Sequence, residues 1–316
     1  MSASFIEPML LLSVESLPQG ADFQYEIKLD GYRAIAFKSR GKVYLRSRNN
    51  NDFSLRYPSI VKALAALPDE TVIDGEVVAL DGEGRPSFNL LQNHGSSGVP
   101  LVFYAFDVMM FEGRDVMALP LSKRRELLEE ILPRLKDPIR DSPRLEASLP
   151  DLIQSVKTQG FEGLVAKNLN SKYEPGLRTG AWKKMRVNKG QEFVIGGFTV
   201  GGNSFDALIF GYYDGDDLIY VARTRNGFTP SSRAELAKRF KALRTAKCPF
   251  ANLPEPKGGR WGAGLTAKKM EDCVWLKPKL VGQFEFTEWT PDNHLRHSRF
   301  LGLREDKALK DVCKES

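Results

Sequence analysis

The stretch YEIKLDGYR (Tyr25–Arg33) begins with the two-residue alternation of a β-strand. Successive strand side chains point to opposite faces of a sheet. The apolar members of the alternation therefore share one face, and Glu26, Lys28 and Asp30 share the other before Gly31 ends the run. A carboxylate, an ammonium and a carboxylate in a row fit either a solvated strand with a ladder of paired charges or a lysine held in a cleft. The stretch by itself leaves both interpretations open.

The size and composition of the chain describe a soluble globular protein. A length of 316 residues predicts one very large domain or two ordinary ones. Hydrophobic residues make up 42% and charged residues 27%, which is enough apolar material for a sizeable core. No segment approaches the roughly 20 apolar residues of a membrane span, so no membrane partner is expected. The opening MSASFIEPMLLLSVESLP has no basic lead, which predicts a cytoplasmic protein.

The cysteines and histidines show no metal-ligand spacing. Cys248, Cys273 and Cys313 are far apart, and the three histidines form no paired motif with them. A structural zinc site or a disulfide framework is therefore not expected, and the cysteines are expected to be buried thiols.

The positive charge lies mainly in the last third of the chain. Of the net charge of +6, residues 1–187 carry +1 and residues 188–316 carry +5. Such an excess suits a polyanionic partner but also an ordinary solvated basic surface. Charge alone leaves both possibilities open.

The first part of the chain reads as a mixture of strands and helices. Residues 23–50 predict a strand pair that turns at Arg40 and Gly41. Further strands are expected at residues 71–80, 98–111, 162–167 and 181–186. Helices are expected at residues 57–67, at 122–132 with Ser122 as the N-cap, and at 149–160 with a C-cap glycine.

The second part of the chain reads as a small β-barrel. After the polar segment VNKGQ (187–191), which is the expected hinge, short strands alternate with glycine-containing turns, and the Gly-Gly pairs at 196–197 and 201–202 read as turns. One helix is expected at 232–243, and the Pro/Gly-rich segment 249–264 reads as a loop. This arrangement suits a barrel of the OB type. The predicted domains are residues 1–187 and 188–316.

Three further segments place charged side chains on strand faces of the first domain. They are DGEVV with Asp74 and Glu76, FEGLVAK with Glu162 and Lys167, and WKKMR with Trp182, Lys184 and Arg186. Taken singly, each fits a surface charge or a buried pair. Together they offer cations for phosphate oxygens and carboxylates for Mg²⁺. No P-loop motif occurs, so strands and side chains would have to hold a nucleotide.

Seven short motifs follow one another in a recognisable order. They are K-x-D-G-x-R (28–33), S-R-N (47–49), D-G-E (74–76), A-F-D (105–107), E-G-L-V-x-K (162–167), W-x-K-x-R (182–186) and L-R-E-D-K (303–307). The series resembles that of the ATP-dependent DNA ligases, which are covalent nucleotidyltransferases, and in particular the ligase module of bacterial ligase D proteins. The resemblance implies an α+β fold, with a nucleotidyltransferase (adenylation) domain of mainly antiparallel sheets with helices and a C-terminal OB-fold β-barrel.

The resemblance assigns Lys28 as the catalytic nucleophile, which attacks the α-phosphorus of ATP and becomes lysyl-AMP. It implies further roles around the nucleotide: Glu26 at the adenine amine, Phe106 on the adenine face, Arg33 and Glu76 at the ribose, Arg48, Lys167, Lys184 and Arg186 at the phosphates, and Glu76, Glu162 and Asp30 at the metal. The last motif, with Arg304, Asp306 and Lys307, is expected to orient the leaving pyrophosphate. Arg186 departs from the lysine that is common at its position, which puts its phosphate contact in doubt because arginine is a rigid fork.

The resemblance also implies the biological setting. ATP would be the AMP donor and Mg²⁺ the metal, with Mn²⁺ as an alternative. The substrate would be nicked double-stranded DNA, sealed through a DNA-adenylate during repair or end joining. Ku or another end-joining protein is the expected partner, and the protein is expected to be a monomer in the bacterial cytoplasm, associated with the nucleoid.

Three other readings remain open from the sequence. The first-domain motifs also fit an RNA ligase or an RNA-capping guanylyltransferase that uses GTP. A non-catalytic OB-type nucleic-acid-binding protein is the reading of a different class, since OB folds bind strands through basic grooves and aromatic side chains.

Overall fold

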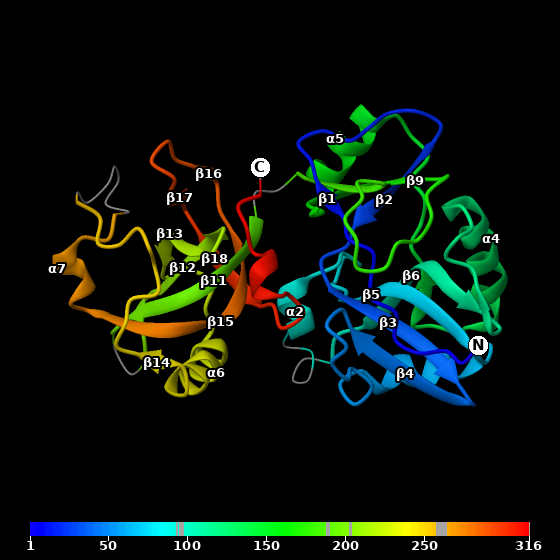
Figure 1. Ribbon diagram of the computed structural model, residues 1–316, viewed down its shortest axis with the longest axis horizontal. Helices are drawn as coiled ribbons and strands as arrows, with labels where there is room; N and C mark the ends of the chain where they lie inside the picture. Colours follow the sequence, from blue (N-terminus) through cyan, green and yellow to red (C-terminus); the bar gives the residue numbers. More distant parts are fainter. Residues whose placement is uncertain (93, 95–97, 188–189, 202–203, 257–263, 316) are drawn as a thin grey trace. The chain divides into compact units, whose positions relative to one another are not determined.

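The computed structural model describes residues 1–92, 94, 98–187, 190–201, 204–256 and 264–315 (Figure 1). By its internal contacts the chain divides into two compact units, Met1–Asn188 and Lys189–Glu315. Each unit combines sheets with helices, and most strand pairs are antiparallel. The predicted α+β class is confirmed. Part of the expected hinge, residues 188 and 189, lies outside the described residues.

The larger sheet of the first unit has six strands in the order β4-β3-β5-β6-β7, with β8 beside β6. Their bounds are β3 Tyr32–Ser39, β4 Lys42–Ser47, β5 Thr71–Ala79, β6 Leu101–Phe111, β7 Arg114–Asp115 and β8 Ile139–Asp141. The β3–β4 turn lies at Arg40 and Gly41, as predicted, and both adopt positive φ angles of 51° and 76°. A positive φ is easy for glycine and is the reason why the strand pair reverses there.

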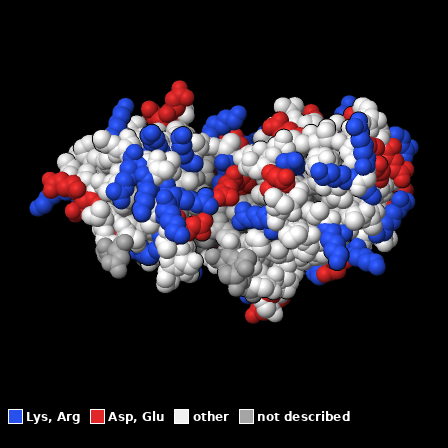
Figure 2. Space-filling model, turned by 90° about the horizontal axis from the view of Figure 1, so that it is seen from below, with Lys and Arg blue, Asp and Glu red and all other residues white. Residues whose placement is uncertain are grey.

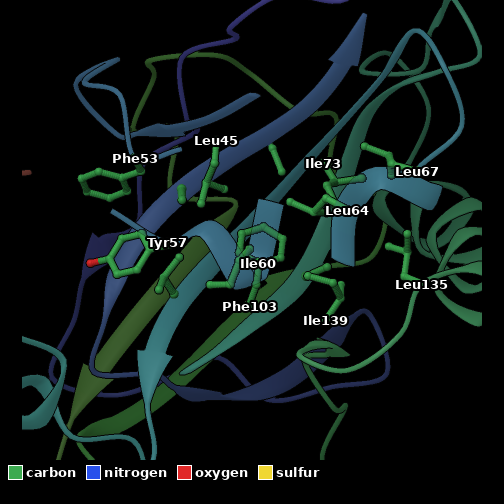
Figure 3. Close-up of a cluster of buried hydrophobic side chains, with 14 of the residues drawn as sticks. Leu45, Phe53, Tyr57, Ile60, Leu64, Leu67, Ile73, Phe103, Leu135 and Ile139 are labelled. Carbon is green, nitrogen blue, oxygen red and sulfur yellow. The ribbon is translucent and has the colours of Figure 1, made fainter. Parts of the chain in front are cut away.

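One face of this sheet is covered by short helices. Ile60 of α1 (Pro58–Ala63) and Leu64 of η1 (Leu64–Ala66) pack against Leu45, Ile73 and Phe103 of the sheet (Figure 3). All five side chains are fully buried. The helix α4 (Leu121–Ile131) and the turn η2 (Leu132–Arg134) cover the same core, and α2 (Phe88–Gln92) packs at β5.

The smaller sheet of the first unit carries the opening stretch. Its four strands lie in the order β1-β10-β9-β2, with bounds β1 Leu12–Ser13, β2 Phe23–Lys28, β9 Gly163–Asn168 and β10 Trp182–Arg186. The helix α5 (Leu149–Gln159) buries Leu152 and Val156 against Leu164 and Met185 on one face of it. The predicted C-cap of α5 is confirmed, because Gly160 has a φ of 74°. The charged side chains of β2 therefore lie on the opposite face of this sheet, away from α5.

The second unit is the predicted OB-fold barrel. Its sheet has the order β13-β12-β11-β15-β14, with β18 beside β15. The bounds are β11 Gly190–Thr199, β12 Leu208–Asp214, β13 Asp217–Thr224, β14 Arg244–Thr245, β15 Cys273–Glu285, β16 Glu288–Trp289, β17 Leu295–Arg296, β18 Arg299–Leu303, α6 Pro230–Lys241, α7 Ala267–Met270 and η4 Leu309–Asp311. Phe193, Phe210 and Phe284 form the centre of its core, with Phe210 and Phe284 stacked at 3.8 Å between ring centroids.

Several local predictions are wrong. The helix α4 begins at Leu121 after Pro120, so Ser122 is inside the helix and is not the N-cap. Gly196 and Gly197 form no turn; they lie inside β11 at a shift of register, where a Cβ on Gly196 would come within 2.5 Å of the Phe250 ring. Cys313 is exposed and therefore not a buried thiol.

Helix α6 of the second unit also begins earlier than predicted. Thr229 and Ser232 form a capping box, which places the first turn at Pro230.

Among the described residues, no helix is long and apolar enough to cross a membrane.

Lysine and arginine side chains gather over the second unit on the face shown in Figure 2. The exposed cations of this unit include Lys241 of α6, Arg244 of β14 and Lys277 of β15. Arg244 and Lys277 lie close together, because the Cα partner of Arg244 on β15 is Leu276, the residue before Lys277. The surplus of cations in this part of the sequence therefore forms an exposed basic surface.

Candidate active site

A hollow in the first unit brings together six of the predicted site residues, Glu26, Lys28, Arg33, Glu76, Phe106 and Lys167. Its empty space, counted together with the part that opens to solvent, is about 490 Å³. It is lined by Leu11, Glu26, Ile27, Lys28, Leu29, Arg33, Glu76, Phe106, Ser142, Val165, Lys167 and Trp182. The charged face of the opening strand thus lines a cleft, which decides the question that the sequence left open.

Lys28 lies at the end of β2 and pairs with the carboxylate of Glu162. Its Nζ is 2.5 Å from Oε2 of Glu162, and Nε of Arg186 donates to Oε1 of the same carboxylate at 2.9 Å. The side chains of Lys28 and Glu162 are each 15% exposed, so the pair is reachable from solvent. One carboxylate therefore holds the predicted nucleophile and a second cation at the same place.

Strand register explains how the two cations come to share Glu162. Gly163 of β9 is the Cα partner of Lys28 on one side and of Arg186 on the other. A Cβ on Gly163 would come within 2.1 Å of the Met185 carbonyl oxygen, so only glycine allows β10 to approach this closely. Glu162, the preceding residue, then lies between the ends of both neighbouring strands.

The charge state of Glu162 predicts a pH dependence of stability. Burial alone would raise the pKa of its carboxyl, but attraction from Lys28 and Arg186 holds this pKa below its ordinary value. The stabilisation is therefore complete at neutral pH and is lost as the pH falls through the folded-state pKa. We expect the urea midpoints of wild type and Glu162→Gln to differ most above about pH 5 and to converge at lower pH. A difference that stays constant down to about pH 3 would contradict this assignment.

Glu26 and Lys167 form a buried ion pair on the wall of the hollow. Each side chain is 3% exposed, and Nζ of Lys167 is 2.8 Å from Oε1 and 2.9 Å from Oε2 of Glu26. Gln24 and Ser142 also donate to this carboxylate, at 2.7 Å and 3.1 Å. Burial lowers the pKa of Lys167 although Glu26 opposes this effect. Both oxygens of Glu26 are thus engaged by protein donors before any adenine amine reaches them.

Two aromatic rings complete the wall beside Lys167. Its Nζ is 4.2 Å from the ring centroid of Phe106 and 4.6 Å from that of Trp182, which is within cation–π range. Phe106 and Trp182 meet edge to face at 6.4 Å. Phe106, which the resemblance assigns to the adenine face, lines the hollow, and Trp182 is a second ring there that was not proposed as a binding residue.

Arg33 is fixed by partners that the sequence did not assign to the site. Its guanidinium donates to both oxygens of Asp74, at 2.9 Å and 2.6 Å. The Tyr173 hydroxyl donates to Asp74 at 2.7 Å and accepts from the backbone of Met9 at 3.0 Å. Burial and the nearby Asp74 raise the pKa of Tyr173 well above its ordinary value, so it stays a donor. Asp74 was visible in the D-G-E motif, whereas no sequence signal marked Tyr173.

The remaining predicted residues of the first unit lie around this hollow or on its strands. Glu76 lines it directly, and Arg48 follows β4 with its backbone bonded to Arg33 at 3.1 Å. Asp30 accepts from the backbone of Phe88 at 3.3 Å, at the start of α2. Lys184 lies on β10 opposite Val165 and contributes to the low pKa of Glu162.

The last motif belongs to the second unit. Arg304 and Asp306 form a two-point ion pair with distances of 2.9 Å and 2.8 Å, and Asp306 is 3% exposed. Lys307 lies 3.7 Å from Glu192 of β11. Within this unit the motif is therefore a set of paired charges.

The carboxylates fit a metal that arrives with a phosphate. Within the described residues, no group of three or more His, Cys, Asp or Glu side chains could cage a metal. Mg²⁺ commonly takes one or two carboxylates and completes its shell with phosphate oxygens and water. Glu76 and Glu162 are single carboxylates of that kind, so the site suits a metal bound jointly with a nucleotide.

A lysine in a hollow flanked by cations and carboxylates, in a unit followed along the chain by an OB barrel, defines the class of the covalent nucleotidyltransferases. The sequence matches the ATP-dependent DNA ligase domain over residues 8–186 and the ATP-dependent DNA ligase C-terminal region over residues 201–307. The chain belongs to the ATP-dependent DNA ligase family.

Individual relatives agree with this membership. The multifunctional non-homologous end joining protein LigD of Pseudomonas aeruginosa is 35% identical over 98% of this chain, and that of Mycolicibacterium smegmatis is 35% identical over 92%. The chain spans 37% of the length of each of these two proteins. A solved structure of mycobacterial DNA ligase D complexed with ATP and MES matches with a TM-score of 0.71 and 30% identity, covering 98% of both chains.

Proposed function

We propose that this chain joins nicked duplex DNA with ATP as the AMP donor, through the sequence of steps that its family uses. The observation that carries the proposal is Lys28 in the hollow, paired with Glu162 beside Arg186, with the buried Lys167 in the same lining. The alternatives of RNA ligation, RNA capping and strand binding without catalysis are less favoured, because both parts of the chain match DNA ligase regions.

In the first step Nζ of Lys28 attacks the α-phosphorus of ATP. The new bond is N–P, the bond that breaks joins this phosphorus to the pyrophosphate oxygen, and the amine loses a proton because only its neutral form is nucleophilic. Glu162 would orient the amine, and Lys167, Lys184 and Arg186 would offset the negative charge that develops on the phosphate. A Mg²⁺ ion, or Mn²⁺, held by Glu76 or Glu162 together with the phosphates would offset further negative charge.

In the next two steps AMP moves from the lysine to DNA and then leaves. A 5′-phosphate oxygen at the nick attacks the phosphorus of lysyl-AMP, which releases Lys28 and forms a DNA-adenylate. The neighbouring 3′-hydroxyl then attacks the 5′-phosphate, the phosphodiester forms, and AMP departs. Binding would rest mainly on the DNA backbone, since sealing needs no reading of bases.

The setting remains part of the proposal. Similarity to proteins named for non-homologous end joining supports a role in DNA repair. The resemblance of the motif series further supports the proposals of Ku or another end-joining protein as partner, of a monomeric state and of a cytoplasmic location at the nucleoid.

A labelling experiment tests the chemistry. The chain is first stripped of any bound AMP with pyrophosphate and then incubated with Mg²⁺ and α-labelled ATP or GTP. We expect protein-bound label from ATP alone on a denaturing gel, and sealing of a nicked DNA duplex after ATP is added. Label from GTP would point to capping, sealing of RNA nicks alone to an RNA ligase, and no label from either nucleotide to a binding protein.

A further inference from the structure

Tyr173 is a buried tyrosine that contacts the wall of the hollow around Lys28, called the nucleotide hollow below. It lies in the segment that joins β9 to β10 and belongs to none of the seven motifs. Its hydroxyl donates to Oδ2 of Asp74 at 2.7 Å and accepts from the backbone N–H of Met9 at 3.0 Å. Both partners are fully buried. A hydroxyl between a buried acceptor and a buried donor serves both of them, and the two contacts together fix its direction.

The ring of Tyr173 is held from two further sides. It meets the ring of Trp182 edge to face, at 5.7 Å between centroids and an angle of 85°. The guanidinium of Arg124 lies 5.7 Å from the centroid of the same ring. Arg124 is itself fully buried and donates to both oxygens of Asp107 at 2.8 Å. The ring therefore has little freedom to move, and its hydroxyl stays beside Asp74.

Asp74 passes this constraint on to Arg33. Ile35 of β3 is the Cα partner of Asp74 on β5, so Asp74 and Arg33 lie diagonally on one sheet face. Nε and Nη2 of Arg33 donate to the two oxygens of Asp74, at 2.9 Å and 2.6 Å. The Tyr173 hydroxyl binds the same carboxylate oxygen as Nη2. A carboxylate with three donors has a fixed plane, and the paired guanidinium takes its orientation from that plane.

The rest of the Arg33 guanidinium is available to a ligand in the nucleotide hollow. In the described part of the chain its N–H groups bond only to Asp74, which uses two of the five donors of a guanidinium. Its central carbon lies 5.1 Å from the ring centroid of Phe106 and 5.7 Å from that of Trp182, and all three side chains line the hollow. The motif resemblance places the ribose of ATP at Arg33. The remaining donors are therefore those that would meet the sugar hydroxyls.

We propose that Tyr173 is a positioning residue for ribose recognition, which holds Asp74 so that Arg33 directs its remaining N–H groups at a sugar hydroxyl of ATP. A hydrogen bond weakens steeply when its donor turns away from the acceptor. Without the phenol, Asp74 still pairs with Arg33 but loses the bond that fixes its plane, so the remaining donors spread over a range of angles. The inference rests on the proposed function, because it assigns a positioning residue to the same nucleotide site.

The test compares three nucleotides on wild type and Tyr173→Phe. After bound AMP is removed with pyrophosphate, the rate of protein labelling is measured against the concentration of α-labelled ATP, 2′-deoxy-ATP and 3′-deoxy-ATP. Wild type should discriminate by at least about tenfold against one of the deoxy nucleotides, the usual effect of a hydrogen bond to a charged group. In Tyr173→Phe this discrimination should fall by at least about threefold, because the donor is no longer directed.

The two kinetic constants for ATP should change unequally. In Tyr173→Phe we expect the half-saturating concentration of ATP to rise about three- to tenfold, since a contact that binds the sugar is weakened. The limiting rate of labelling should change by less than about twofold, because Lys28 and the cations expected at the phosphates keep their places. A general defect of the fold would leave the half-saturating concentration of the folded fraction unchanged.

A matched control removes a different hydroxyl. The hydroxyl of Tyr25 donates to the carbonyl oxygen of Pro18 at 2.7 Å, and its side chain packs in the cluster of α5, on the face of β2 opposite to Lys28. Tyr25→Phe should show wild-type discrimination. Each discrimination is a ratio of rates from one preparation, so the folded fraction cancels. Unchanged ratios in Tyr173→Phe would overturn the proposal, and so would a wild type that uses all three nucleotides equally well.

A second substitution tests the route through Asp74. Asp74→Asn keeps the size of the side chain but leaves one acceptor oxygen for Arg33, so this variant alone should lose discrimination by at least about threefold. Adding Tyr173→Phe to it should change the ratio by less than about twofold, since the link is already broken. A further threefold loss in the double variant would overturn the proposed route. Failure of the wild-type chain to take label from ATP is a different result, because it would remove the proposed function itself.

Discussion

Replacing Lys28 by alanine is expected to abolish self-adenylation and the sealing of an ordinary nick, with a loss of at least about 10³-fold. Lys28 is the only lysine whose amine both lines the nucleotide hollow and reaches Glu162 in the described part of the chain. Without this amine no N–P bond can form. The measurement is labelling with α-labelled ATP on a denaturing gel, together with a nick-sealing assay.

Two comparisons separate nucleophilicity from charge and folding. Lys28→Arg keeps a cation opposite Glu162, but its guanidinium stays protonated, so we expect no labelling from it either. Lys28→Arg should unfold close to the wild-type urea midpoint, and both variants should still seal a nick that already carries AMP, since that step does not use the amine as nucleophile. Protein-bound label in Lys28→Ala would show that another residue is adenylated.

Replacing Lys167 by alanine is expected to lower the free energy of unfolding by about 3–5 kcal/mol and to prevent self-adenylation. The carboxylate of Glu26 is 3% exposed and would lose its only charged hydrogen-bond partner among the described residues. A buried charge left without its counterion is strongly destabilising. Urea unfolding and ATP labelling measure the two effects.

The reason for this loss can be tested by removing both charges together. The double variant Glu26→Gln, Lys167→Met should recover most of the lost stability, because no buried charge remains, but it should not recover labelling. The exposed Lys157 of α5 supplies the control, since Lys157→Ala is expected to change stability by less than about 0.5 kcal/mol. A midpoint for Lys167→Ala equal to that of this control would contradict the buried pair.

The secondary structure that positions the site could be predicted from local sequence. The alternation of YEIKLDGYR places Glu26 and Lys28 on one face of β2, and both line the nucleotide hollow. The β3–β4 turn and the C-cap of α5 depend on glycines whose backbone angles few other residues adopt. The start of α4 could not be predicted in the same way, because Ser122 and Pro120 both fit a helix start and only the surrounding packing selects between them.

The partners of the site residues could not be predicted. Lys28 pairs with a residue 134 positions away, and Lys167 with one 141 positions away. Tyr173 reaches Asp74 from a segment without any motif. The sequence suggested phosphate contacts for Lys167 and an adenine contact for Glu26, whereas the folded unit also bonds these two side chains to each other.

By itself, the sequence determined the class of fold, the order of the motifs and the side chains that share each strand face, because these depend on neighbouring residues and on the two-residue period of a strand. The tertiary structure alone decided which charges meet and that Glu162 serves both Lys28 and Arg186. Such pairings arise from strand register and packing between distant segments, and local periodicity carries no information about them.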